Sequence, residues 1–455
     1  MNKNSKILGS ESIWKLLIKL SLPATIGMMV QALYNLVDTI FVGRGVGTLG
    51  ITGITLSFPV QMIVMAIAQM IGIGGASIIS RALGEKNAQK AEKTMGNIFT
   101  LVILMSATIS ILGLIFINPL LSLLGTNSVS INAAKDYLSI ILFGTIFFSF
   151  SMASNNIVRA EGNAKTAMYT MLISAGLNII LDPIFIFILH LGIKGAAIAT
   201  VLSQATTALY LIYYFLSGKS SIKLHFKNFK LKSGIITEIM AIGSSAFVRQ
   251  SAGSLLTIIL NNILMVYGGV LYVAVYGLTN RLLMFVLMPL FGIAQGFQPI
   301  AGFNYGAKNY SRVKDVTKAS IITTTILSSI GFFILILFPK QLLSVFTTDT
   351  NLILTASNVL KIIILFLPLI GIQIIGATMF QAIGKAFSSL ILAMSRQIIF
   401  LIPLIYIMPI FFGINGVWIS FPISDFLATL LTSILFYFQM KKFNTNSTLS
   451  KDINL

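Results

Sequence analysis

Cysteine is absent from the sequence, and histidine occurs only twice, as His190 and His225. Without thiols the chain can form neither disulfides nor thiolate metal sites, and the two histidines lack the spacing of a metal site. Charged residues are also scarce, at 9% of the chain, and only 12 of them are acids. The clusters of acids or histidines typical of a membrane enzyme are missing. The sequence therefore predicts neither an enzyme nor a cofactor.

Apolar residues are what the chain has in abundance. They make up 56% of its 455 positions, and the mean hydropathy is +0.93. Runs of about 20 apolar residues recur throughout, which suits transmembrane helices and is too long for the strands of a barrel. We expect an all-α integral membrane protein with twelve transmembrane helices, at about 13–42, 51–80, 95–117, 133–158, 166–190, 195–216, 235–266, 271–303, 317–338, 352–382, 387–411 and 416–439.

The basic residues divide between the two sides of these spans. The net charge is +19, and most of the lysines and arginines fall in alternate connections together with both termini. The opposite connections carry only Arg44, Lys135, Lys194 and Lys340. By the positive-inside rule both termini are then cytoplasmic, and the excess charge reflects topology rather than nucleic-acid binding. The lysine-rich stretch 219–232 becomes a cytoplasmic linker that can also touch anionic lipid.

The chain also repeats itself with an offset of 222 residues. The segment 84–90 (GEKNAQK) resembles 306–312 (GAKNYSR), and 160–164 (AEGNA) resembles 382–386 (AIGKA). Six spans in each half leave both halves in the same orientation, as in transporters with two pseudo-symmetric lobes around a central cavity. The predicted division is a first lobe at 1–216, a linker at 217–234, a second lobe at 235–440 and a cytoplasmic tail at 441–455.

Three acids lie well within apolar runs: Asp38, Asp182 and Asp425. Gln31, Tyr34 and Asp38 are spaced i, i+3 and i+7, so they share one face of a helix. An ionisable residue inside a membrane is costly and marks a functional site by default. The alternative is that Asp38 lies at the helix end, where headgroups hydrate it.

Asp182 has polar neighbours of its own. Asn178 precedes it by one helical turn, Pro183 directly after it should distort the helix and free carbonyl groups, and Thr200 lies in the next span. These oxygens suit a hard cation, and two nearby carboxylates equally suit a shared proton. Asn178 and Thr200 could instead only join helices. Asn155 and its neighbour Asn156 either join this cluster or cap their helix.

The second half differs at the matching positions. Asn262 replaces Asp38, and the spans contain Arg249, Arg281 and Arg396. Asp425 could pair with one of these arginines, or it could belong to a second coupling site; the buried pair is the simpler interpretation. Trp14 and Trp418 are expected to anchor the protein at the membrane interface.

Together these residues resemble the multidrug and toxic compound extrusion (MATE) family. The resemblance covers nearly the whole chain and is most specific at the first-lobe proton or sodium site, formed by Gln31, Tyr34, Asp38, Asn178, Asp182 and Thr200. Pro23 matches the proline at which the family's first helix is proposed to bend. A sodium-coupled subgroup also has acids in the seventh and tenth spans, where this chain has Gln250, Asn261, Gln373 and Gln381.

The resemblance implies a multi-pass antiporter of the bacterial inner membrane, which exports cationic, lipophilic compounds in exchange for H⁺ or Na⁺. Any sodium ion would be bound by Asp38, Asn178, Asp182 and Thr200, and no other metal is expected. We expect a monomer whose partners are its small-molecule substrates and the lipid bilayer. The alternatives are a lipid-linked-precursor flippase of the same superfamily, for which the three arginines would bind pyrophosphate, and a major-facilitator transporter, whose acidic-glycine-arginine loop pattern is missing at Gly84.

Overall fold

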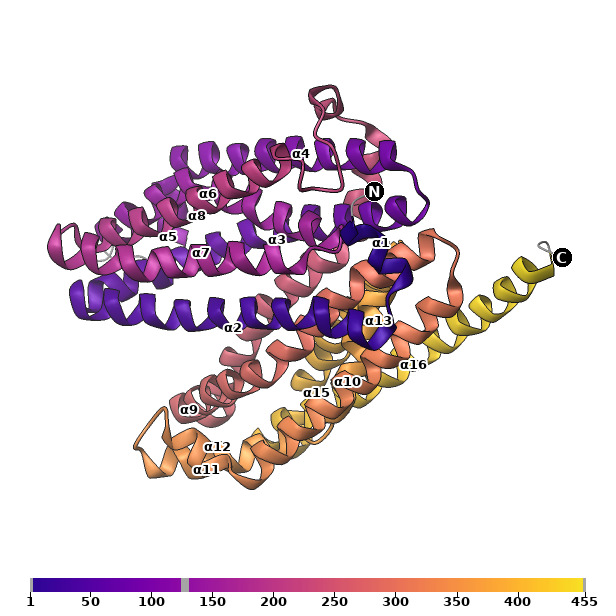
Figure 1. The fold of residues 1–455 in the computed structure, drawn as a ribbon. Coiled ribbons are helices and arrows are strands. Elements are labelled where there is room, and N and C mark those ends of the chain that lie inside the picture. Colours follow the sequence, from indigo (N-terminus) through magenta and orange to yellow (C-terminus); the bar gives the residue numbers. More distant parts are fainter. Residues whose placement is uncertain (1–2, 124–130, 453–455) are drawn as a thin grey trace. The chain divides into compact units, whose positions relative to one another are not determined.

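The computed structural model describes residues 3–123 and 131–452, which form helices and no strand (Figure 1). This confirms the all-α class. The described residues pack as two compact units: unit 1 lies within Met1–Ser10 and Ile26–Gly243, and unit 2 within Glu11–Thr25 and Ser244–Leu455. The packing units divide the chain at other places than the predicted lobes. Glu11–Thr25 of the predicted first lobe packs with unit 2, and residues 217–243, the predicted linker and the start of the predicted second lobe, pack with unit 1.

Two helices contribute to both units, namely α2 (Ile13–Gly45) and α9 (Ser233–Gly306). The other elements of unit 1 are α1 (Lys3–Ser10), α3 (Thr48–Gly84), α4 (Ala88–Ile115), α5 (Ile117–Leu123), α6 (Ile131–Ala160), α7 (Ala164–Pro183), the π-helical turn η1 (Ile184–Ile188), α8 (Gly192–Leu216) and the 3-10 turn η2 (Phe226–Phe229). Those of unit 2 are α10 (Tyr310–Leu337), α11 (Pro339–Ser344), α12 (Thr350–Ile363), η3 (Leu367–Leu369), α13 (Ile370–Ala382), α14 (Ala386–Met394), η4 (Ser395–Leu401), α15 (Ile402–Phe412) and α16 (Ile414–Asp452).

The helices are long and apolar enough to cross a membrane twelve times. Within the described ranges ten helices qualify as they stand, and α12 with the bent continuation Leu367–Ala382 makes an eleventh span with a 49° bend. A twelfth comes from α9, which at 74 residues would be about 110 Å long and is broken at Gly269, where φ is 72°. Because only glycine adopts this backbone conformation readily, Gly269 separates two spans.

The two halves repeat in structure as they do in sequence. Lys86 and Lys308 both adopt positive φ, 58° and 57°, directly before an asparagine that begins the next helix. Asn87 accepts a hydrogen bond from the Lys90 N–H of α4, and Asn309 accepts one from the Arg312 N–H of α10. Asparagine is among the best N-cap residues, so the repeated Gly-x-Lys-Asn motif is a turn followed by a helix cap.

Small residues allow close helix packing near the starts of α2 and α9. In unit 1 a β-carbon at Gly243 would lie 1.9 Å from the Met70 carbonyl oxygen of α3, so the two backbones touch. In unit 2 a β-carbon at Gly296 would lie 2.3 Å from the Ser21 hydroxyl of α2. Since Ser21 and Gly243 are 222 residues apart, the two crossings correspond in the repeat.

The core of unit 2 corrects one expectation. Trp418 is 1% exposed, stacks on Tyr272 with ring centroids 6.3 Å apart, and belongs to the apolar cluster between α9, α12 and α16. It is therefore a core residue and no interfacial anchor. Trp14, by contrast, is 53% exposed near the start of α2.

Candidate functional site

Helices α2 and α7 of unit 1 pack in a constant register, which brings the two predicted acids together. Gly27 of α2 lies against Met171 of α7, and Val42 shares an apolar cluster with Ile186 in the turn after α7. In both pairs the partner is 144 positions further along the chain. The helices therefore run parallel, and the same register places Asp38 level with Asp182.

Both carboxyl groups lie in this contact and interact with each other. Asp182 is fully buried, and Asn178 donates from Nδ2 to its Oδ1 at 3.2 Å and to Thr200 Oγ1, also at 3.2 Å. Within the described part of the chain, no N–H or O–H group donates to Asp182 Oδ2 or to Asn178 Oδ1. Two buried oxygens thus stay open to a proton or a cation beside Asp38.

Two tyrosines enclose the pair. Tyr34, one helical turn before Asp38, interacts with the Thr200 hydroxyl and lies close to both carboxyl groups. Tyr137 of α6 is 4% exposed, lies close to the same carboxyl groups and interacts with Gln61 of α3. The sequence analysis did not identify Tyr137 or Gln61. Neither has a spacing signal, because each comes from a different helix and reaches the pair only through tertiary packing.

The helix distortion predicted at Pro183 is present. Helix α7 ends at this residue and continues as the π-helical turn η1, in which the Leu189 N–H donates to the Ile184 carbonyl at 2.9 Å. Proline has no N–H to continue the α-helical ladder. The wider turn begins at Ile184, two residues after Asp182.

The other predicted residues lie elsewhere. Asn155 of α6 donates to the Ala167 carbonyl at 3.2 Å and to Thr170 Oγ1 at 2.6 Å, so its hydrogen bonds join α6 to α7 away from the carboxyl pair. Gln31 is half-buried on α2, one turn before Tyr34. Pro23 is buried in the segment of α2 that packs with unit 2.

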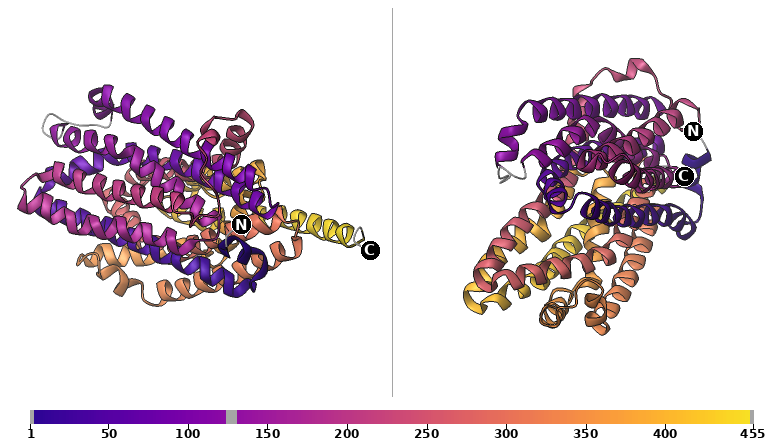
Figure 2. Two further views of the ribbon diagram at one scale, coloured as in Figure 1. Left: turned by 45° about the horizontal axis from the view of Figure 1, so that its top comes forward. Right: turned by 90° about the vertical axis from the view of Figure 1, so that its left-hand side faces the viewer.

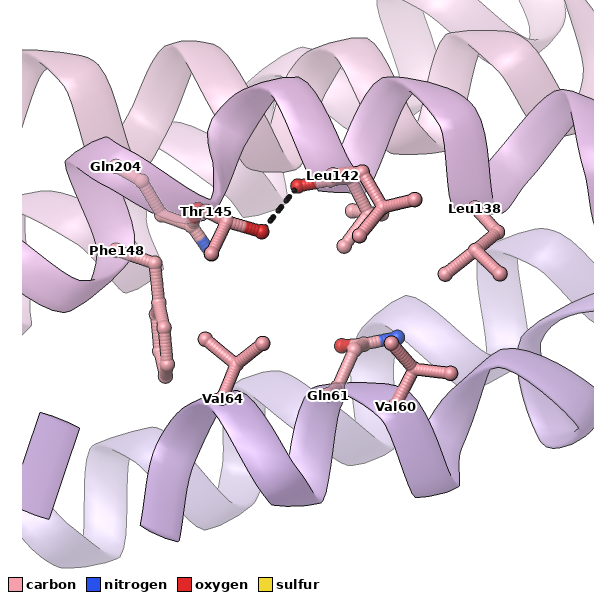
Figure 3. Close-up of a pocket in the computed structure, with 9 residues that line it drawn as sticks. Val60, Gln61, Val64, Leu138, Leu142, Thr145, Phe148 and Gln204 are labelled. Carbon is pink, nitrogen blue, oxygen red and sulfur yellow. Dashed lines mark hydrogen bonds between the residues drawn. The ribbon is translucent and has the colours of Figure 1, made fainter. Parts of the chain in front are cut away.

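A pocket opens within unit 1, between α3, α6 and α8 (Figure 3). It holds about 380 Å³ of space, including its mouth, and is lined by Val60, Gln61, Val64, Leu138, Ile141, Leu142, Thr145, Phe148 and Gln204. The lining is aliphatic and aromatic, with two amides and no charge. Gln61 both lines the pocket and interacts with Tyr137, so it links the apolar wall to the acidic pair.

In unit 2 the predicted buried pair is confirmed. Arg396 donates from Nε to Asp425 Oδ1 at 2.5 Å and from Nη2 to Oδ2 at 3.5 Å. Gln373 donates to the Asp425 carbonyl and to Thr429 Oγ1, both at 2.9 Å. The charge of Asp425 is balanced by Arg396, so this acid differs from the open pair of unit 1.

A third buried acid lies outside the spans. Glu161, in the turn between α6 and α7, accepts hydrogen bonds from the Tyr214 hydroxyl at 2.5 Å, Ser220 Oγ at 2.8 Å and the Ser221 N–H at 2.6 Å. Its carbonyl accepts one from Ser5 of α1 at 3.3 Å. Burial raises the pKa of Glu161 to about 7, although these hydrogen bonds favour its charged form. The residue joins α1, α8 and the linker.

Comparison with known proteins agrees with the internal repeat. The MatE family model matches residues 23–184 and 246–407. The second match begins 223 positions after the first, close to the 222-residue offset of the repeat. More than half of the chain is covered by the two matches.

Relatives of the same length are multidrug transporters. The multidrug export protein MepA of Staphylococcus haemolyticus is 29% identical over 426 residues, which is 94% of either protein. A structure of the MATE multidrug transporter DinF-BH is 47% identical, with a TM-score of 0.88 over 96% of this chain and 98% of that one. An outward-facing multidrug resistance transporter of the MATE family is 29% identical, with a TM-score of 0.92 over 98% and 99% of the two chains.

Proposed function

The chain belongs to the MATE family, and we propose that it exports cationic, lipophilic compounds in exchange for a proton or a sodium ion bound at Asp38 and Asp182. The observation that supports this coupling site is the buried carboxyl pair, which leaves Asp182 Oδ2 and Asn178 Oδ1 without a donor. Two adjacent carboxylates in a membrane need a counter-charge, and a proton or a cation supplies it.

Exchange follows from competition for this negative charge. With the site open to the outside, a proton or sodium ion neutralises the pair, and a bound cationic substrate is no longer attracted and leaves. With the site open to the cytoplasm, the ion dissociates and the carboxylates attract the next cation. Because both ligands neutralise the same groups, binding of one opposes binding of the other, and the two are transported in opposite directions.

The pocket of Figure 3 supplies the second half of substrate recognition. Phe148 and the aliphatic side chains suit a lipophilic body, while the Gln61 and Gln204 amides can bind polar substituents of varied shape. The uncharged lining leaves the attraction for a positive group to the Asp38–Asp182 pair, to which Gln61 and Tyr137 connect the pocket. Lipophilic cations fit this division. Arg396 is already paired with Asp425, so it is not free to bind the pyrophosphate of a flippase substrate.

The proposed membrane and orientation of the protein follow from the charge distribution. The MepA relatives are bacterial, and the basic connections belong on the cytoplasmic side of the inner membrane together with both termini. One charge that crosses a potential of about 100 mV provides about 2.3 kcal/mol, and each pH unit adds about 1.4 kcal/mol. The exported monovalent cation must move against the same potential, so in a one-for-one exchange the electrical contributions cancel and the concentration gradient of the ion drives transport. A drug gradient of about a hundredfold needs about 2.7 kcal/mol, which corresponds to about two pH units or an equal gradient of sodium.

Ethidium efflux from liposomes that contain the purified protein tests the proposal. A pH gradient and a sodium gradient are imposed in turn, and tetraphenylphosphonium serves as a second lipophilic cation. We expect efflux with at least one gradient and a fall to the protein-free rate in Asp38→Asn, because an amide neither holds the proton nor attracts the cation. Asp136→Asn is the matched control, since Asp136 is exposed and pairs with Lys194 at 3.3 Å. Full efflux by Asp38→Asn would refute the coupling site.

A further inference from the structure

The linker between the two halves presents a basic surface with apolar tips. Its exposed side chains, here called the linker patch, are Lys223, Phe226, Lys227, Lys230, Leu231 and Lys232. Phe226 is 86% exposed, more than any other large apolar side chain described. It lies between lysines on both sides, and with the exposed Leu231 it gives the patch two apolar side chains among four lysines.

Helix α4 holds the backbone of this patch in one conformation. Asn97 donates from Nδ2 to the Asn228 and Lys230 carbonyls, both at 3.3 Å, and accepts from the Lys232 N–H at 2.8 Å. Thr100 donates to the Phe229 carbonyl at 2.8 Å. The patch is therefore an ordered surface along α4, and both views show the linker there, beside the label of this helix in Figure 1 and at the top of the right-hand view in Figure 2.

The position on α4 places the patch at the edge of the apolar part of the helix. Lys93 is the last charged residue of α4, and the rest of the helix to Ile115 carries no charge. Phe99, in the first apolar turns, contacts Phe229 with ring centroids 6.3 Å apart, and Phe229 stacks on Phe226 at 6.0 Å. Phe226 therefore lies near the point where the charged start of α4 gives way to its apolar part. Aromatic residues are enriched at this level of membrane proteins.

The lysines of the patch keep their charge available. Among the described residues, no acid forms an ion pair with Lys223, Lys227, Lys230 or Lys232. Two acids contact the linker, and both are otherwise engaged. Glu92 pairs with His225 at 3.7 Å, and Glu161 is buried under Ser220 and Ser221. A surface with four free positive charges next to an exposed phenyl ring suits a ligand that has negative charge and an apolar part.

We propose that the linker patch binds anionic phospholipids of the membrane leaflet in which α4 begins. The lysines contact the phosphate groups, while Phe226 and Leu231 insert among the first methylenes of the acyl chains. The lipid fits better than a soluble polyanion, because the apolar tips gain nothing from a ligand without acyl chains. This surface is separate from the carboxyl pair, and its function does not depend on the identity of the exported compound.

Fluorescence quenching in nanodiscs tests the proposal with the full chain. Phe226→Trp is placed in discs of equal parts phosphatidylcholine and phosphatidylglycerol, with bromine on the acyl chains of one lipid or the other, and the unsubstituted chain gives the background of Trp14 and Trp418. We expect brominated phosphatidylglycerol to quench Trp at 226 at least about twofold more strongly, since each lysine near the surface attracts anionic lipid. About 0.5 M salt should reduce this preference, because the Debye length falls to about 4 Å.

Two variants of the Phe226→Trp protein separate a charge effect from a folding effect. In Lys223→Gln/Lys227→Gln/Lys230→Gln the preference should fall to about one, because charge attraction is lost while Trp at 226 stays beside the lipid. The matched control Lys135→Gln/Lys194→Gln/Lys340→Gln removes the same charge elsewhere and should retain the preference. Equal quenching by both lipids in the starting protein, or an unchanged preference in the linker triple, would overturn the proposal.

Discussion

At the scale of single residues, carboxyl groups occur in three different environments in this protein. Asp182 and Asp38 face each other with oxygens left open, Asp425 is neutralised by Arg396, and Glu161 is buried under hydroxyl donors. Only the first arrangement leaves buried oxygens without a hydrogen-bond donor, and the proposed coupling depends on this property. The partners of each carboxyl group, and not its burial alone, therefore distinguish the three acids.

Glu161 leads to a prediction about pH. Because its folded-state pKa of about 7 lies above the ordinary value of 4.5, its contribution to stability is complete below pH 4.5 and is lost as the pH rises through 7. This amounts to about 3 kcal/mol. Glu161→Gln removes the titrating group and with it this loss of stability at high pH. The melting temperature of the variant minus that of the unsubstituted protein should therefore increase as the pH is raised from 5 to 8.

Thermal unfolding in detergent at a series of pH values measures this difference. Glu85→Gln is the matched control, since Glu85 is an exposed acid that pairs with Lys90 at 3.7 Å. The control should follow the unsubstituted protein at every pH. If Glu161→Gln also follows it, the carboxyl group does not titrate in this range and the prediction is wrong.

At the scale of elements, packing between helices decides what the polar residues can do. The parallel register of α2 on α7 aligns the two acids, and the π-helical turn begins where Pro183 ends the regular ladder. The linker is likewise an ordered element, because Asn97 and Thr100 bind its backbone. These contacts join residues that are remote in the sequence.

The crossing of α3 and α9 gives a prediction about glycine. Gly243→Ala would place a β-carbon against the Met70 carbonyl, and because backbone cannot give way as a side chain can, the variant should lose about 1–3 kcal/mol of stability. Gly277→Ala, in the span that follows the break at Gly269, meets nothing within 4 Å and should be neutral or stabilising by up to about 1 kcal/mol. Melting temperatures of the two variants in detergent provide the comparison. Equal stability would mean that the crossing tolerates a methyl group.

At the scale of the whole molecule, the two halves share their turns and helix packing but differ in their charged residues. Both halves use the same Gly-x-Lys-Asn turn and the same small-residue crossing, yet the acids within the spans differ. Asn262 stands where the first half has Asp38, and unit 2 has a neutral Arg396–Asp425 pair. The family model matches both halves, so the scaffold is duplicated, whereas the proposed coupling site lies in unit 1 alone.

The absence of cysteine makes the topology directly testable. Single cysteines at Lys219 and Lys308 should react with a membrane-impermeant maleimide only after the cells are opened, because the positive-inside rule places these connections in the cytoplasm. Cysteines at Lys194 and Lys340 should react in intact cells. The opposite labelling pattern would show that the predicted orientation in the membrane is wrong. The unsubstituted chain, which has no thiol, gives the background of the measurement.

Several features of the protein were determined by the sequence alone. Apolar runs of sufficient length can only be helices in a membrane, so they predicted the class and the twelve spans, and the repeat offset predicted the paired turns. Asp38, Asp182 and Asn178 could be selected because acids and amides in such runs are rare, and Thr200 because its hydroxyl lies in the next span. Each of these inferences depends on local properties or on a comparison of the chain with itself.

Tertiary structure decided the rest, because contacts between distant helices leave no spacing in the sequence. The 144-residue register that aligns Asp38 with Asp182, the approach of Tyr137 and Gln61, and the separate place of Asn155 all depend on which helix faces meet. Trp418 proved to be a core residue for the same reason, since a tryptophan near a helix end can face lipid or protein. The chemical type of a side chain determines whether it favours a buried or a hydrated site, while only helix packing determines which residues it contacts.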